Sequence, residues 1–196
     1  MPQTHQCKSE KRASSQARLL VLGVGLLALA FAAGTFLAPV LISSGGPWGG
    51  FLRLSYAPVC HQLTERSLPV GDGFQAVCAR CSGLYLGAVA GLFVAAALLM
   101  GRRSAPRPIW LAVVAVPTFI DALLPWVGLP ALPNYPRLLL AWPVGFVAAL
   151  FVARGIAEIV ASRSGRPGPG DCTEDDRDEN WIARRTGRES LEVVDG

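Results

Sequence analysis

The chain has 196 residues, enough for one domain. Its hydrophobic fraction is 52% and its charged fraction only 16%, whereas a soluble domain carries about 25% charged residues. The sequence contains long apolar runs without charged residues, and such runs are typical of a chain that lies partly in a lipid bilayer. The net charge of +4 comes without a basic patch interleaved with aromatic residues, so we expect no nucleic-acid partner.

A polar segment, residues 1–17, opens the chain, and we expect a disordered cytoplasmic tail there. We interpret His5 and Cys7 in this segment, and Cys172 near the other end, as a solvated imidazole and reduced thiols. An uncharged run then predicts a membrane-spanning helix over residues 19–42, because about 20 apolar residues cross the hydrocarbon layer as a helix. A cleaved signal peptide is the alternative, but its apolar region is usually only about 7–15 residues long.

The segment between the first two apolar runs, residues 43–77, and the start of the second run hold three of the five cysteines. Cys78 and Cys81 are three residues apart at the start of a predicted helix, so their side chains share one face. The helix N-terminus and the neighbouring Arg80 both lower the pKa of a thiol there. A Cys-His pair upstream is far enough away to fold back over this helix end. We therefore predict one site that contains Cys60, His61, Cys78 and Cys81.

Three kinds of site fit this cluster. The first is a metal site for zinc, iron or copper(I), the ions that sulfur and imidazole donors suit. Cys60 and His61 are adjacent and point in different directions, so a three-ligand site with an open position is favoured over a closed four-ligand site. The second is thiol redox chemistry, in which Cys78 and Cys81 cycle between dithiol and disulfide with Cys60 as their partner. The third is a structural disulfide with one spare thiol.

Two known classes of cysteine site match this sequence less well. Quinone-linked disulfide oxidases are four-helix membrane proteins with a similar cysteine pair, but they need a second outward pair, and only Cys60 is left here. A haem attachment is not expected, because its motif is Cys-x-x-Cys-His, whereas Ser82 follows Cys81.

The second apolar run predicts a span over residues 79–100. Gly83, Gly87 and Gly91 recur in it with a period of four and leave one helix face as bare backbone, so a neighbouring helix can pack very close. This glycine face predicts a packing surface, either for another span or for a second copy of the chain in a homo-oligomer.

Two more apolar runs follow. The third predicts a span over residues 108–129, in which Pro117 and Pro125 predict a kink or break. The fourth predicts a span over residues 137–160. The remainder, residues 161–196, begins with a Gly/Pro-rich stretch and continues with an acidic one, so we expect a second disordered cytoplasmic tail.

Asp121 is the one charged residue within the third run. An acid inside the membrane costs about 2.5–3.5 kcal/mol on insertion scales and is usually paired or functional. The structural interpretation is an ion pair with Arg80 or Arg137. The functional interpretation is a proton acceptor, or a partner that orients His61. We expect Arg66, Arg80, Asp121 and Arg137 to support the cysteine site.

Basic residues predict the orientation, because cytoplasmic segments are rich in Lys and Arg. They gather in the N-terminal tail, in the connection between the second and third spans and in the C-terminal tail, whereas the other two connections hold only Arg53, Arg66 and Arg137. Both termini are therefore predicted to be cytoplasmic. The protein would lie in the cytoplasmic membrane with the cysteine cluster on its outer face.

The residues around the cysteines also form a motif in three parts, namely Cys60-His61-Gln62, Arg66-Ser67 and Cys78-Ala79-Arg80-Cys81-Ser82-Gly83-Leu84-Tyr85-Leu86-Gly87. This motif resembles that of a prokaryotic membrane-protein family known as domain of unknown function 2085. The resemblance covers roughly residues 50–147 and extends to Asp121, Asn134, Arg137 and Gly145. It implies a multi-pass membrane protein and supplies no activity. Ala122, Pro125 and Ala141 stand where the family tends to have Gly, Gln and Gly.

The sequence thus predicts an all-α membrane protein, a four-helix transmembrane bundle over residues 18–160 with an outer loop or interfacial segment between its first two spans. Its expected surroundings are the lipid bilayer. The favoured function is an uncharacterised multi-pass protein with an extracytoplasmic, metal-binding Cys/His cluster. The alternatives are a membrane thiol-disulfide oxidoreductase and a structural disulfide in a transport or assembly accessory protein. Whether the protein is an enzyme is left open.

Overall fold

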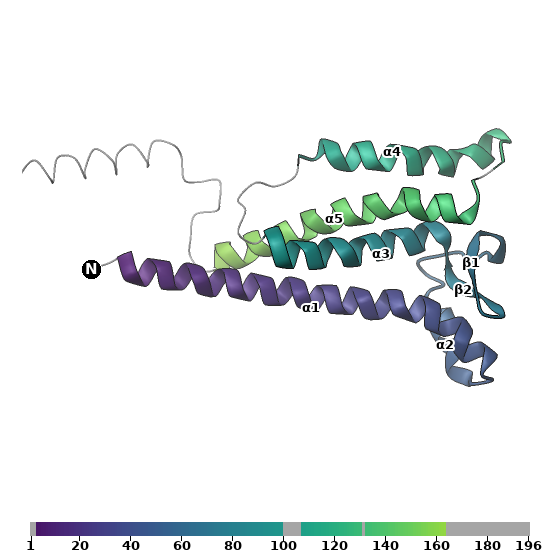
Figure 1. Cartoon of the computed structure of the whole chain (residues 1–196), viewed down its shortest axis with the longest axis horizontal. Helices are drawn as coiled ribbons and strands as arrows, with labels where there is room; N and C mark the ends of the chain where they lie inside the picture. Colours follow the sequence, from purple (N-terminus) through teal and green to yellow (C-terminus); the bar gives the residue numbers. More distant parts are fainter. Residues whose placement is uncertain (1–2, 100–106, 131, 164–196) are drawn as a thin grey trace, which may run out of the picture. The chain divides into compact units, whose positions relative to one another are not determined.

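The computed structural model of the chain describes residues 3–99, 107–130 and 132–163. Four long helices form the frame of this part of the chain (Figure 1). They are α1 (Gln3–Ser43), α3 (Ala79–Val94), α4 (Ile109–Leu123) and α5 (Asn134–Arg163). Residues 1–157 form one compact unit, and the last turns of α5 belong to a second unit. All packing discussed below lies within the first unit.

The chain has four helical segments long and apolar enough to cross a membrane, two of which include the irregular turns that follow α3 and α4. This confirms the predicted class of four-span helical membrane protein. The four segments are Ser15–Ser43, Ala79–Ala97, Ile109–Val127 and Asn134–Arg163. Large apolar side chains stand exposed along these helices, for example Leu27 on α1, Phe119 on α4 and Leu139 on α5. Such a surface is stable only against lipid or another apolar surface, so it implies contact with the bilayer.

The helix boundaries differ from the sequence prediction at several points. α1 begins at Gln3, although we expect a disordered tail up to residue 17. The reason is that residues 3–22 contain neither Gly nor Pro and are rich in Ala, Gln, Lys and Arg, which propagate a helix readily. α5 starts at Asn134 and continues to Arg163, a few residues beyond both predicted ends. The predicted tail lies outside the described residues from position 164 on, and Cys172 lies there with it.

The two prolines of the third span behave differently. α4 continues through Pro117. It gives way at Leu124 to a 3-10 turn, Leu124–Val127, that has Pro125 near its start. Gly128, with a φ of +76°, ends this turn. The expected break is thus found at Pro125. α3 also ends irregularly, in a π-helical turn over Ala95–Leu99.

A short helix and a β-hairpin connect the first two spans, where the sequence predicts only a loop or interfacial segment. The helix is α2 (Pro47–Ser55), and Trp48, Phe51 and Leu54 stand exposed along it. A 3-10 turn, Thr64–Arg66, then leads into the hairpin. We refer to the end of the bundle where this hairpin lies as the hairpin end (Figure 1).

The hairpin consists of antiparallel strands β1 (Ser67–Val70) and β2 (Gly73–Cys78). Val70 pairs with Gly73 across a two-residue turn, and Gly71 adopts a φ of +57° at its first position, as a type II′ hairpin turn requires. β2 ends at Cys78, which is also the N-cap of α3. The hairpin therefore runs directly into the second span.

The glycine face of α3 packs against α5 of the same chain. A Cβ atom added at Gly83, Gly87 or Gly91 would collide with the backbone carbonyl of Leu138, Trp142 or Phe146, respectively. The contact is reciprocal, because a Cβ at Gly145 would collide with the Leu84 carbonyl. The predicted close packing is confirmed. Its partner is another span, so this face is covered within one chain and is not free to join two copies.

Replacing Gly87 tests this packing. Gly87→Ala should destabilise the protein by about 1–3 kcal/mol, as overpacking of a filled interior does, because the new methyl group must displace helix backbone. Thermal unfolding of the detergent-purified protein measures the change. Gly23→Ala is the matched control, since a Cβ there meets no atom within 4 Å, and it should leave the midpoint unchanged or slightly higher. Equal midpoints for the two variants would contradict the proposed contact.

Candidate functional site

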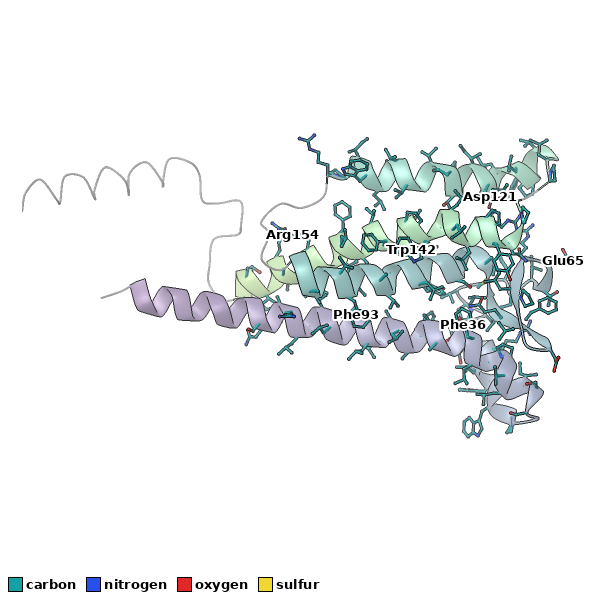
Figure 2. All side chains as sticks on the ribbon, viewed as in Figure 1. Phe36, Glu65, Phe93, Asp121, Trp142 and Arg154 are labelled. Carbon is teal, nitrogen blue, oxygen red and sulfur yellow. The ribbon has the colours of Figure 1, made fainter. Side chains whose placement is uncertain are left out.

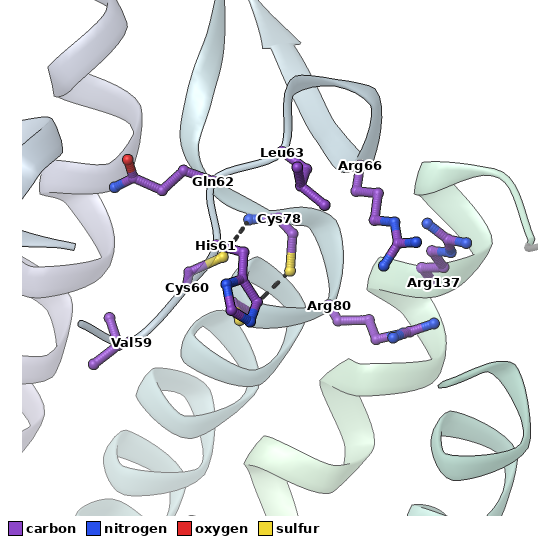
Figure 3. Close-up of a pocket in the computed structure, with 10 residues that line it drawn as sticks. Val59, Cys60, His61, Gln62, Leu63, Arg66, Cys78, Arg80 and Arg137 are labelled. Carbon is purple, nitrogen blue, oxygen red and sulfur yellow. Dashed lines mark hydrogen bonds between the residues drawn. The ribbon is translucent and has the colours of Figure 1, made fainter. Parts of the chain in front are cut away.

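Three cysteines from separate parts of the chain meet at the hairpin end. Cys60 lies just beyond α2, Cys78 ends β2, and Cys81 lies in the first turn of α3. The backbone N–H of Cys78 donates a hydrogen bond to the Cys60 sulfur at 3.2 Å, and a hydrogen bond at 3.5 Å joins the sulfurs of Cys78 and Cys81 (Figure 3). All three sulfur atoms lie within 4.8 Å of one another. All three cysteines are free thiols.

His61 lines the same cavity as the cysteines (Figure 3). Its side chain is exposed, and the group of potential ligands whose donor atoms all lie within 4.8 Å comprises only the three cysteines among the described residues. Cys60 is buried and His61 is exposed, although both line the cavity. A ligand role for His61 stays a prediction.

Buried aromatic packing holds Cys60 in place. The backbone N–H of Cys60 donates to the Tyr56 carbonyl at 3.0 Å. Tyr56 is itself buried, and its hydroxyl donates to the Phe31 carbonyl of α1 at 2.7 Å. Burial raises the pKa of Tyr56, which keeps this hydroxyl a donor. The Phe31 ring makes edge contacts with both Tyr56 and Tyr85, so α1, α2 and α3 meet beneath Cys60.

The environment of Cys78 favours its thiolate. The hydrogen bond with Cys81 is the largest of several effects that lower the pKa of Cys78 to about 5, and it outweighs the opposing effect of burial. Backbone N–H groups of Arg80 and Cys81, in the first turn of α3, contribute in the same direction. A thiolate is both the metal-binding and the nucleophilic form of cysteine.

A buried polar network that sequence reasoning missed fixes the start of α3. Gln75 on β2 is fully buried, and its amide donates to the Thr35 hydroxyl of α1 at 2.8 Å. The Ser82 hydroxyl lies 2.8 Å from the other end of the same amide. Thr35 in turn donates to the Ala32 carbonyl. The one signal in the sequence is a glutamine between apolar residues. These hydrogen bonds link α1, β2 and α3 and offset the cost of burying the polar groups.

Asp121 is the central acceptor between α3, α4 and α5. It is 1% exposed and pairs with the guanidinium of Arg80, whose Nε lies 2.6 Å from the carboxylate and whose Nη2 also donates to the Asp121 carbonyl. Arg137 Nε lies 3.5 Å from the other carboxylate oxygen, and the backbone N–H of Leu132 donates to it at 3.3 Å. Both arginines named as candidate partners are therefore ion-paired with Asp121. Figure 2 shows Asp121 and Glu65 at the hairpin end.

Hydrogen bonds from two side-chain amides hold the segment that carries His61. The Asn134 side chain, at the start of α5, donates to the carbonyls of Glu65 and Ser67 at 3.2 and 3.1 Å. The Gln62 side chain donates to the Arg53 carbonyl on α2. Gln62 has a φ of +52°, a conformation that few non-glycine residues adopt. These contacts hold the cavity wall between α2 and α5.

The cysteines open onto a cavity of about 190 Å³ (Figure 3). Its lining brings together the predicted site residues and the predicted supports, with the exception of Asp121, which lies behind two of the arginines. The lining residues are Val59, Cys60, His61, Gln62, Leu63, Arg66, Cys78, Arg80, Cys81 and Arg137. The site is thus a thiol cluster beside a strongly basic wall.

Comparison with known proteins places this region in a family. The family model described as "Predicted membrane protein (DUF2085)" matches residues 60–151. An uncharacterized protein of Methanothermobacter thermautotrophicus is 30% identical over 99 residues, which make up 50% of this chain and 86% of that protein. The chain belongs to this family. The region matched by the family model contains all the cavity-lining residues except Val59.

A second archaeal relative matches the same share of this chain. An uncharacterized protein of Methanocaldococcus jannaschii is 26% identical over 98 residues, which cover 50% of this chain and 63% of that protein. The chain thus spans somewhat less than two thirds of this relative. No solved structure matches the chain. The DUF2085 assignment confirms the resemblance seen in the sequence, and it supports a membrane protein without assigning an activity.

Asp121→Asn tests the central ion pairs. The substitution leaves Arg137, whose side chain is 5% exposed, without its carboxylate, and breaking a buried pair costs about 3–5 kcal/mol. We expect a large drop in the thermal midpoint and in the yield of folded protein, measured by fluorescence-detected size exclusion. Asp72→Asn in the exposed hairpin turn is the control and should change stability by no more than about 0.5 kcal/mol. A stable Asp121→Asn protein would rule out the structural role.

Proposed function

We propose that this DUF2085 protein binds a transition-metal ion through the thiolates of Cys60, Cys78 and Cys81, at the face of the membrane where α3 begins. The observation that carries the proposal is the convergence of three free thiols to within 4.8 Å, with Cys60 brought from a separate segment to the Cys78–Cys81 pair. A single structural disulfide needs only two of them. Gathering a third buried or half-buried thiol is readily explained by a shared ligand.

The distances between the sulfurs support this interpretation. A zinc ion binds thiolate sulfur at about 2.3 Å, so two sulfurs on one tetrahedral ion lie about 3.8 Å apart. The separations here, from 3.5 Å up to 4.8 Å, include that value. Small side-chain rotations would therefore seat an ion without moving the backbone. The low pKa of Cys78 adds a thiolate that is ready to bind a cation at neutral pH.

The set of donors suits soft or borderline ions. Three thiolates are typical ligands of zinc, of copper(I) and of iron in sulfur-rich sites, and calcium or magnesium would instead need oxygen ligands. His61 lies on the cavity side of the cluster, where it is available as a fourth ligand after a side-chain rotation. Without it, the fourth position faces the cavity and is open to an incoming molecule.

Thiol redox chemistry is the second candidate, and one observation favours it. Cys78 and Cys81 already share a hydrogen bond at 3.5 Å at a helix N-terminus, and Cys78 has the low pKa of a reactive thiol. A disulfide between them would form by loss of two electrons and two protons to an external oxidant. The buried Cys60 would be left as a third thiol beside the pair.

Metal analysis distinguishes the two candidates. Protein purified without chelators should contain close to one zinc, copper or iron ion per chain by elemental analysis. Cys60→Ser, Cys78→Ser and Cys81→Ser should each lower the metal content at least tenfold, because three ligands leave no spare. Cys7→Ser and Cys172→Ser are the matched controls, since the sequence predicts both residues to lie in the tails and not in the site, and both should keep full metal content.

The opposite outcome is a metal-free wild-type protein. Tryptic digestion then separates the alternatives, because cleavage after Arg53, Arg66 and Arg80 places Cys60, Cys78 and Cys81 in three different peptides. Alkylation of intact cells before digestion should show a mixture of oxidised and reduced Cys78–Cys81 pairs for a redox site. A pair that is always oxidised would identify a structural disulfide.

The orientation is part of the proposal. The bias of Lys and Arg toward the two tails and the connection between α3 and α4 supports cytoplasmic termini and an extracytoplasmic cysteine cluster. An Asp72→Cys variant offers a reporter at the exposed hairpin turn. A membrane-impermeant maleimide should label this cysteine in intact cells. Labelling that requires lysed cells would place the cluster on the cytoplasmic side.

A further inference from the structure

The wall of the cavity opposite the cysteines carries more positive charge than the protein itself neutralises. Arg66, Arg80 and Arg137 all line the cavity, and no acidic side chain is among the ten lining residues (Figure 3). Asp121, behind the wall, is the one carboxylate paired with these arginines in the described part of the chain. It serves Arg80 and Arg137 together, so two positive charges remain that no carboxylate balances.

Each arginine has donors left over. Arg80 directs Nε and Nη2 at Asp121, which leaves the Nη1 group free of that carboxylate. Arg137 is 4% exposed, and its Nε lacks a hydrogen-bond partner although it lies 3.5 Å from Asp121. The side chain of Arg66 has no ion pair within residues 3–99, 107–130 and 132–163. Buried donors without partners cost free energy until a ligand satisfies them.

The helix ends add to the positive potential. α3 begins at Ala79 and α5 at Asn134, both at the edge of the cavity, and neither helix has an acidic residue in its first turn. Helix N-termini carry a partial positive charge. A divalent ion on three thiolates would add one negative charge, so the cavity would stay positive with the metal bound. The positive potential of the cavity therefore does not depend on the proposed metal centre.

We propose that this cavity binds an oxyanion of the phosphate type, held by Arg66, Arg80 and Arg137. Guanidinium groups match the oxygens of phosphate in bidentate pairs. Three of them, from three different elements, offer more donors than the two oxygens of a carboxylate can use. The cavity also lies where two spans begin, at the depth of lipid headgroups. The phosphate can therefore belong to a phospholipid or to a small soluble molecule.

Arg66 is the best residue with which to test the site. It is exposed and lies on a 3-10 turn, so Arg66→Gln should fold normally, which size exclusion and the thermal midpoint verify. Arg53→Gln is the matched control, because it removes the same charge from α2 at the hairpin end and Arg53 does not line the cavity. Arg66→Lys keeps the charge but loses the bidentate geometry.

Two probes distinguish the sources of the phosphate. Radiolabelled inorganic phosphate is measured by equilibrium dialysis, and dioctanoyl phosphatidic acid by titration calorimetry, both with full-length protein in an uncharged detergent at constant ionic strength. We expect saturable binding of at least one probe with one site per chain. Arg66→Gln should weaken it at least tenfold, Arg66→Lys by an intermediate factor, and Arg53→Gln by less than twofold. Binding of phosphatidic acid alone identifies a lipid headgroup, and comparable binding of both identifies a soluble ligand.

Two results would overturn the proposal. One is the absence of saturable binding for both probes, and the other is an equal loss of affinity in Arg66→Gln and Arg53→Gln, which would indicate unspecific charge attraction. Metal content measured on the same samples keeps the two proposals separate. Phosphate binding by a metal-free protein would refute the metal centre alone, and metal without phosphate binding would refute the oxyanion site alone.

Discussion

The ion pairs of Asp121 are the interaction on which the hairpin end depends. One buried carboxylate on α4 forms ion pairs with Arg80 on α3 and with Arg137 on α5. Charged groups in a low-dielectric interior attract strongly and are costly to separate. The pairs therefore hold three helices in a fixed register at this end. The same two guanidinium groups, those of Arg80 and Arg137, also line the cavity. They therefore belong both to the ion pairs and to the candidate site.

Further along their axes, α3 and α5 are held together by the glycine contacts. Without side chains at Gly83, Gly87 and Gly91, the two backbones touch, and van der Waals packing replaces the hydrophobic effect that lipid cannot supply. The first turns of both helices thereby lie close together. This close approach also keeps the two arginines of the basic wall together next to the thiols, because a thicker interface would separate Arg137 from Arg80.

Much of the fold could be predicted from the sequence, because membrane spans are selected by length and apolar content alone. The predicted start of the second span, residue 79, is the first residue of α3, and the third span begins within one residue of its predicted position. The gathering of Cys60 with Cys78 and Cys81 follows from the short chain segment between them. Both arginine partners of Asp121 could be named because few charges lie at that depth.

Other features depend on tertiary contacts that a single sequence does not encode locally. The hairpin contains a proline in β1 and a glutamine in β2, and its stability comes from packing and from the Thr35–Gln75–Ser82 network rather than from strand propensity. Next to the exposed His61, Gln62 adopts a positive φ that its residue type does not predict. The basic cavity depends on Arg66, which reaches it from a turn that no helical pattern predicts.

The absence of a loop between β2 and α3 has a mechanical consequence. Cys78 is both the last residue of a strand and the N-cap of a membrane helix. The hairpin and the span are therefore joined without a linker. Cys78 is therefore held by the strand on one side and by the helix on the other. The position of its sulfur, and with it the geometry of the thiol cluster, is thus set by both the hairpin and the second span.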